Sequence, residues 1–342
     1  MEEKIKNYNR NADVIKALLV WAVITLHFPF KNLSADSPIY SFLLDHTVPG
    51  FMFMSGYVRT LSLDKKGYSS LEDAYSFNEL IKSLLRLVIP FTVYFVFAQI
   101  FLRIIGYFTI GIVEYGLLAT VYDYLRGFRG EGAYYFPIMI QFVFLFPVIW
   151  RIIKKKGFAG VWIVFAINLF YEIIRQAFGM TGYEYSLLIF RYMFIISCGC
   201  YAALYKPGKT GLNALLMVMT VIVGMAFIYL FVYSGYGPSA RIITDWQRSS
   251  LLTCLYAAPF FFIVSLKGKM RFKPLEIVGK ASFNIFLVQM LYFIYYHFTV
   301  KDKVGEMIHY PLSILICTIL GIAFYYPERY LTAYVVKKIT RS

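Results

Sequence analysis

Residues 13–27 read DVIKALLVWAVITLH, an apolar run that carries an acid, a base and a histidine. It is long and apolar enough to belong to a helix that crosses a bilayer. At 100° per residue, Lys16 and His27 differ by only about 20° around such a helix, and Asp13 falls within roughly 40° of the same line. His27 lies about 16 Å beyond Lys16 along the axis. Ionisable groups at membrane depth usually face a bundle interior or a wet cavity, so we interpret this polar stripe as the wall of an active site.

The composition indicates a polytopic membrane protein. Of 342 residues, 59% are hydrophobic and 20% aromatic, and the mean hydropathy is +0.62, more apolar surface than a soluble domain of this size can bury. The net charge of +15 comes from short basic clusters between apolar runs. This is the positive-inside pattern, with attraction to anionic membrane lipid, and it argues against nucleic acid as a partner. The polar start of the chain lacks the pattern of a cleavable signal.

Apolar windows of about twenty residues predict about ten membrane helices, an all-α polytopic bundle. The windows are 14–33, 41–62, 83–106, 135–153, 158–175, 187–205, 212–234, 250–267, 281–299 and 311–335. The richer set of basic connections places both termini in the cytoplasm. Residues 110–124, in a long outer connection, are too short and polar to span and are expected to lie at the interface or fold back. We expect one membrane-embedded domain over residues 1–342.

The second window contains Ser55 and Gly56, small residues that allow close approach either of another helix or of a ligand. In the third window, Arg86 either snorkels to the interface or binds the phosphate of a donor that enters from the cytoplasm. Glu172 and Arg175, three residues apart, are expected to form a structural ion pair. The four cysteines are expected to be buried free thiols, and no metal site is predicted because they lack metal-ligand spacing; they are Cys198, Cys200, Cys254 and Cys317.

Five short patterns occur along the chain, each at one place. They are Asp13-x-x-Lys16-Ala17 followed by His27, Val48-Pro49-x-Phe51-x-x-x-Ser55-Gly56-Tyr57, Arg86-x-x-x-Pro90, Tyr134-Tyr135-Phe136, and Ser282-Phe283-Asn284-Ile285-Phe286-Leu287-Val288-Gln289. Together they resemble membrane acyltransferase family 3, whose first helix carries an arginine, ten intervening residues and a histidine. Three positions depart from that family: Lys16 replaces the arginine, Tyr135 a tryptophan, and Gln289 a late histidine. Lysine keeps the charge without the planar fork of arginine, and glutamine cannot do acid–base work.

The resemblance implies an O-acyltransferase that moves a short acyl group, most simply acetyl, from acetyl-CoA to a hydroxyl. The acceptor would be a glycan, as a surface or exported polysaccharide or its lipid-linked precursor, at a bacterial cytoplasmic membrane. His27 would be the general base, Asp13 and Lys16 would be further catalytic residues, and Lys16 and Arg86 would bind the donor. Acceptor or oxyanion candidates are Ser55, Tyr57, Tyr135, Arg191, Asp45, His46 and Gln289, among which Asp45 and His46 are placed to orient His27.

Two other functions stay open on the sequence alone. Ten helices around a polar cavity also suit a carrier or flippase for a sugar-lipid or small metabolite, although the repeated half-structure typical of carriers is not seen. The replacement at Gln289 keeps a non-catalytic relative in view. The sequence leaves the acceptor, the acyl length and the oligomeric state open, and a homo-oligomer is one alternative.

Overall fold

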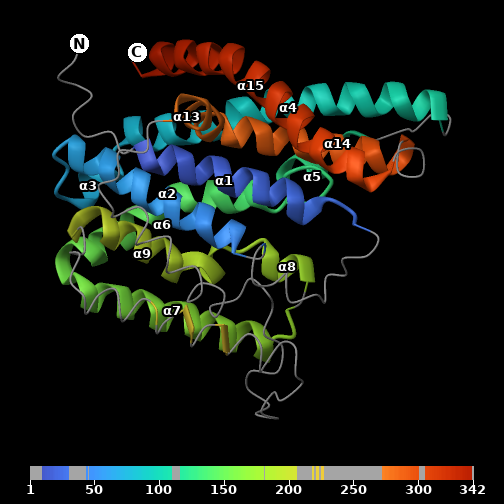
Figure 1. The fold of residues 1–342 in the computed structure, drawn as a ribbon. Coiled ribbons are helices and arrows are strands. Elements are labelled where there is room, and N and C mark those ends of the chain that lie inside the picture. The colour runs from blue at the N-terminus through green and yellow to red at the C-terminus, as the bar shows by residue number, and fades with distance from the viewer. Residues whose placement is uncertain are drawn as a thin grey trace. The chain divides into compact units, whose positions relative to one another are not determined.

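The computed structural model describes residues 10–30, 44, 46–109, 116–180, 182–205, 218, 221–222, 225–226, 272–299 and 305–340. Its regular elements within these ranges are all helical, as predicted, and Figure 1 labels the α-helices. They are α1 (Arg10–His27), α2 (Thr47–Lys65), α3 (Leu71–Ala74), α4 (Phe77–Thr109), α5 (Leu117–Leu125), α6 (Tyr135–Lys156), α7 (Phe158–Ala177), α8 (Gly182–Ser186), the 3-10 helix η3 (Ile189–Tyr192), α9 (Met193–Tyr205), α13 (Lys273–Lys280), α14 (Ser282–Thr299) and α15 (Glu306–Ile339).

Four helices of the described part are long and apolar enough to cross a membrane: Leu71–Ile104, Tyr135–Lys156, Phe158–Arg175 and Glu306–Ile339. A fifth is obtained if α13 and α14, which meet at 67°, count as one broken span. The windows 212–234 and 250–267 lie almost wholly outside the described residues. Ten spans and the side on which the termini lie therefore stay predictions.

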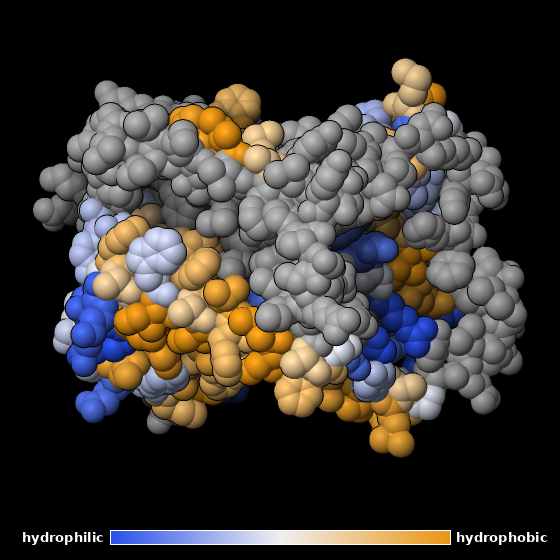
Figure 2. Space-filling model, turned by 90° about the horizontal axis from the view of Figure 1, so that it is seen from below, coloured by the Kyte–Doolittle hydropathy of each residue, from blue (hydrophilic) through white to orange (hydrophobic). Residues whose placement is uncertain are grey.

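The surface of α7 supports a membrane environment. It exposes large apolar side chains along its whole length: Phe158, Trp162, Ile163, Ile167, Phe170 and Ile173. Figure 2, which looks at the molecule from the side on which Figure 1 draws α7, shows orange apolar residues at the surface. An exposed apolar surface of this kind is normal where lipid is the solvent.

Contacts divide the chain into two compact units, each built from two distant stretches of sequence. Unit 1 is Met1–Ala74 with Phe146–Lys280, and unit 2 is Tyr75–Leu145 with Ala281–Ser342. Helix α6 belongs to both, because the division falls inside it. The prediction of one domain is not tested by this division.

In unit 1, α2 packs against α9 and α1, and α7 packs against α9 (Figure 1). The α2–α9 contact is between backbones: a Cβ on Gly56 would lie 2.4 Å from the carbonyl oxygen of Ile196, and one on Gly199 would lie 2.1 Å from that of Phe53. Only glycine permits such an approach. Of the two alternatives for Gly56, close helix packing is therefore the one the structure shows.

Gly199→Leu is expected to destabilise unit 1, because α9 must move away from α2 to admit the side chain. We expect a loss of roughly 1–3 kcal/mol or more, the cost of overpacking. Thermal unfolding of the purified protein in detergent measures it. The control is Gly116→Leu at the start of α5, where a Cβ would meet nothing within 4 Å. Equal unfolding temperatures for the two variants would contradict the close packing.

In unit 2, α14 packs against α15, and both contact α4. A buried polar network joins α14 to α15: Asn284 donates a hydrogen bond to Glu328 Oε2 at 3.2 Å, and Thr332 donates one to Oε1 at 2.5 Å. The predicted interfacial stretch is helical from Leu117 to Leu125. These nine residues are about 14 Å long, too short to span a bilayer.

Three of the four cysteines, Cys198, Cys200 and Cys317, are buried thiols outside any disulfide, as predicted. Cys254 lies outside the described residues.

Candidate active site

At the N-terminal end of the predicted stripe, Asp13 and Lys16 form an ion pair within α1. Lys16 Nζ lies 2.7 Å from Asp13 Oδ1, and the two side chains are 24% and 5% exposed. The pair joins residues three apart, which face the same side of a helix. Pairing lowers the cost of placing these charges in an apolar segment. Lys16 is therefore engaged with Asp13 and still partly accessible.

Helix α13 packs against α1 at Asp13. A Cβ on Gly279 would lie 1.9 Å from the carbonyl oxygen of Asp13, so the two backbones touch. One turn earlier, the buried side chain of Glu276 lies 4.0 Å from the Arg10 guanidinium. Sequence reasoning missed Glu276, because residues 273–280 were assigned to a connection. Two acids and two bases therefore lie where α1 and α13 pack together: Arg10, Asp13 and Lys16 from α1, and Glu276 from α13.

His27 is the last residue of α1, and its side chain is partly exposed. At 1.5 Å per residue it lies about 16 Å along the helix from Lys16, as the spacing requires. Of the residues proposed to orient it, His46 stands at the start of α2, and Asp45 lies outside the described residues. The pairing of Asp45 with His27 stays a prediction.

The two hydroxyl candidates on α2 differ in access. Tyr57 is buried, 6% exposed, and its ring stacks near that of Phe53 with the centroids 6.3 Å apart. Ser55 is partly exposed. Because α2 packs on α1, both belong to the unit that holds His27, and Ser55 is the more accessible of the two.

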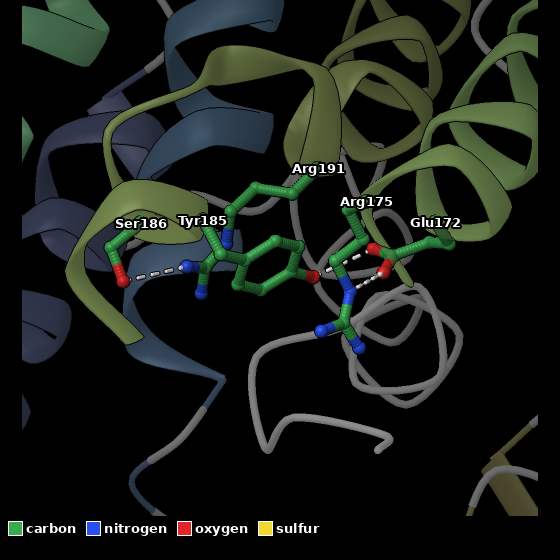
Figure 3. Close-up of polar contacts among 5 residues, drawn as sticks. All are labelled: Glu172, Arg175, Tyr185, Ser186 and Arg191. Carbon is green, nitrogen blue, oxygen red and sulfur yellow. Dashed lines mark hydrogen bonds and ion pairs between the residues drawn. The ribbon is translucent and has the colours of Figure 1, made fainter. Parts of the chain in front are cut away.

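A buried polar cluster lies between α7, α8 and η3 (Figure 3). Arg175 Nε donates to Glu172 Oε2 at 3.0 Å, which confirms the predicted ion pair. The Tyr185 hydroxyl donates to the other carboxylate oxygen at 2.6 Å. The guanidinium groups of Arg175 and Arg191 each lie 4.5 Å from the centroid of the Tyr185 ring. Tyr185, which sequence reasoning missed, is thus the centre of the cluster.

Arg191 is held inside this cluster. It is 2% exposed, and its Nη1 donates to Ser186 Oγ at 3.2 Å. The resemblance made Arg191 a candidate for acceptor or oxyanion contacts. In the structure its guanidinium packs on aromatic rings, those of Tyr185 and Tyr192.

The other candidates lie in unit 2. Arg86 is exposed on α4, and Tyr135 begins α6 with its ring 5.1 Å from that of Phe286. Gln289 is fully buried in α14. The structure thus gives Arg86, but not Gln289, a side chain that solvent can reach.

Unit 2 also contains a histidine that sequence reasoning missed. His309 is 2% exposed, and its Nε2 lies 2.7 Å from the Tyr292 hydroxyl. Its ring stacks on that of Tyr296, with the centroids 4.0 Å apart. In the sequence Tyr292 and Tyr296 lie one helical turn apart and so share a face. Their partner, His309, lies on another helix, which the spacing does not reveal.

Comparison with known proteins decides the family. Residues 9–326 match the family model described as an acyltransferase domain, that of acyltransferase family 3. The chain belongs to acyltransferase family 3. No curated protein and no solved structure matches the chain significantly.

The family match includes every candidate residue, because it runs from the start of α1 into α15. It supports a membrane acyltransferase in general terms. Across the ranges that the structure describes, no three His, Cys, Asp or Glu side chains converge in a way that could hold a metal ion.

Proposed function

We propose that this family 3 acyltransferase moves a short acyl group, most simply acetyl, from acyl-coenzyme A to a hydroxyl. The acceptor is a sugar of a cell-surface or exported polysaccharide or of its lipid-linked precursor. The observation that carries this proposal is the family match over residues 9–326, which includes α1 with an accessible histidine at its end. The setting is a bacterial cytoplasmic membrane, with both termini in the cytoplasm.

In this mechanism His27 is the general base. Neutral imidazole accepts a proton near neutral pH, so it can remove the proton from the acceptor hydroxyl as the oxygen attacks the thioester carbonyl. The new C–O bond forms, the C–S bond breaks, and the coenzyme A thiolate leaves and is then protonated. Direct transfer needs no nucleophile other than the acceptor.

The oxyanion that forms on the carbonyl needs hydrogen-bond donors. Ser55 is kept as a candidate because its side chain is partly exposed. Tyr57 is the alternative from the same helix. Tyr135 is a third oxyanion candidate. Asp45 and His46 are proposed to orient His27, and Arg191 and Gln289 are kept as candidates for acceptor contacts.

Lys16 and Arg86 are proposed to contact the phosphates of the donor. An ammonium group has three N–H donors, and the contact with Asp13 uses one of them. Arg86 offers an exposed guanidinium, which binds phosphate through two parallel hydrogen bonds.

The test is calorimetric binding of acetyl-CoA to the purified protein in lipid nanodiscs. Lys16→Ala and Arg86→Ala are each expected to weaken binding by roughly ten- to a hundredfold, as the loss of a hydrogen bond to a charged group would. Lys16→Arg keeps the pair with Asp13 and is expected to bind like the wild type. Arg103→Ala, another exposed arginine of α4, is the control for Arg86.

Absence of acetyl-CoA binding by the folded wild-type protein would refute the proposed donor. Unchanged binding in both alanine variants would leave the donor in place and remove Lys16 and Arg86 from its site.

A further inference from the structure

The first turn of α2 lies at the same end of unit 1 as His27. Helices α1 and α2 pack against each other and run in opposite directions (Figure 1). They touch where a Cβ on Gly50 would lie 2.8 Å from Leu19 Cδ2. From that contact α1 continues for about 12 Å to His27, and α2 extends about 4.5 Å in the same direction to its first residue, Thr47. Thr47 therefore lies roughly 7–8 Å from His27 along the helix axes.

The start of α2 has hydrogen-bond donors that its own helix does not use. The N–H of Gly50 donates to the carbonyl oxygen of His46 at 2.8 Å, the first bond of the helix. The N–H groups of Thr47 and Val48 come before it and have no acceptor inside the helix, and Pro49 has no N–H. Within the described structure, the His46 side chain forms no capping hydrogen bond. A helix start of this kind carries a partial positive charge and attracts anions.

The Thr47 side chain supplies a further donor at this turn. It is 0% exposed, and its hydroxyl has no hydrogen-bond partner among the residues that the structure describes. Burying a hydroxyl without a partner is costly, so this group calls for a further partner. Side chains lean toward the start of their helix, and Thr47 is the first residue of α2. Its hydroxyl is therefore directed past the end of the helix, where the N–H groups of the first turn also point.

We infer that the first turn of α2 is the oxyanion site of the acyl transfer, with the Thr47 hydroxyl donating to the thioester carbonyl oxygen. The backbone N–H groups of Thr47 and Val48 donate beside it. The inference rests on the proposed function and adds Thr47 to it as a catalytic residue. Negative charge develops on the carbonyl oxygen as the acceptor attacks, and fixed donors kept from water stabilise that charge. These donors give up no proton, because the proton of the acceptor hydroxyl goes to His27.

The distance from His27 suits this role. A base and an oxyanion donor are separated by two hydrogen bonds, each about 3 Å long, with the acceptor oxygen and the carbonyl between them. The His27 side chain leans back along α1, toward the level of Thr47. The reacting atoms can therefore bridge the axial gap of about 7–8 Å. Ser55 lies eight residues further along α2, about 12 Å farther from His27.

The turn also combines a buried hydroxyl with access from the surface. His46 and Val48, on either side of Thr47, are partly exposed, and so is His27. A hydroxyl kept from water makes stronger hydrogen bonds than an exposed one. The alternative is that Thr47 only fills space between helices. A side chain of the same shape without the hydroxyl would then serve equally well.

The experiment removes the hydroxyl and keeps the shape of the side chain. Thr47→Val is the main variant, and Thr47→Ser retains the hydroxyl. The matched control is Thr60→Val, because Thr60 is also 0% exposed on α2 but donates to the carbonyl oxygen of Gly56 at 2.7 Å. Membranes that contain each full-length protein are assayed for transfer of the tritiated acetyl group of acetyl-CoA into glycan. The purified proteins in nanodiscs are assayed for acetyl-CoA affinity and unfolding temperature.

We expect Thr47→Val to lower the rate of transfer roughly 10²-fold, the effect of removing one oxyanion donor. Its affinity for acetyl-CoA is expected to stay within a few-fold, because the charge develops only during the reaction. Its unfolding temperature is expected to equal or exceed that of the wild type, since the hydroxyl has no bond to lose. Thr60→Val is expected to do the reverse, with a lower unfolding temperature and a nearly normal rate. Thr47→Ser is expected to transfer acetyl within a few-fold of the wild-type rate.

A Thr47→Val protein that transfers acetyl at the wild-type rate would overturn the inference and leave the proposed function standing. An unfolding temperature as low as that of Thr60→Val would also overturn it, because the hydroxyl would then serve the fold. A Thr47→Ser protein as slow as Thr47→Val would do the same, because the hydroxyl would not be the group that matters. A wild-type protein that neither binds acetyl-CoA nor transfers its acetyl group would refute the proposed function, and the inference with it.

Discussion

Replacing His27 by Gln is expected to lower the rate of acyl transfer by roughly 10²–10⁴-fold, the usual contribution of a positioned general base. Glutamine keeps a polar side chain at the end of α1 but cannot take a proton from the acceptor. Transfer of the tritiated acetyl group of acetyl-CoA into the glycan fraction of membranes that contain the variant measures the effect. Affinity for acetyl-CoA is expected to stay within a few-fold of the wild type, because the imidazole acts on the acceptor.

Thr25→Ala is the control for this experiment. Thr25 lies two residues before His27 on α1, and its hydroxyl donates to the carbonyl oxygen of Trp21 at 2.9 Å. Its loss removes a local hydrogen bond of the same helix and is expected to leave the rate nearly unchanged. A His27→Gln protein as active as Thr25→Ala would mean that the base lies elsewhere.

Glu172→Gln is expected to lower the free energy of unfolding by about 3–5 kcal/mol, because it removes the carboxylate of a buried ion pair. Glu172 and Arg175 are both no more than 5% exposed, and the carboxylate also accepts from the Tyr185 hydroxyl. Without that charge, the Arg175 guanidinium loses its carboxylate partner in an apolar surrounding. Unfolding of the purified protein in detergent, induced by heat or by denaturant, measures the change.

Two further variants identify the cause. Glu184→Gln changes an exposed glutamate of α8 and is expected to cost almost nothing. Glu172→Leu/Arg175→Leu removes both charges together and is expected to be more stable than Glu172→Gln. If Glu172→Gln and Glu184→Gln unfold alike, the buried pair contributes little to stability.

The sequence predicted relations that are set within a single helix. It placed Asp13 and Lys16 on one line of a helix, and it predicted the ion pair of Glu172 and Arg175, because residues three apart face the same side. Gly56 was recognised as a place of close approach because it is a small residue in an apolar window.

The contacts that the sequence did not predict join residues that are distant in the chain. Lys154 and the Tyr68 carbonyl are 86 positions apart, and Tyr292 meets His309 across two helices. Helix α13 was not predicted, because its residues, KPLEIVGK, are too polar for a membrane span. In the structure it packs on α1 through Gly279. The window 187–205 gave no sign that it begins with the 3-10 turn Ile189–Tyr192 before α9.

The pairing of α1 with α13 has a consequence for biosynthesis. Helix α1 is synthesised long before its partner, Lys273–Lys280. As a predicted membrane helix, α1 would enter the bilayer before the helix that finally packs on it is made. Because Asp13 and Lys16 neutralise each other within α1, the helix can be inserted early with its charges already satisfied. Their ion pair then serves the nascent chain before it serves the folded protein.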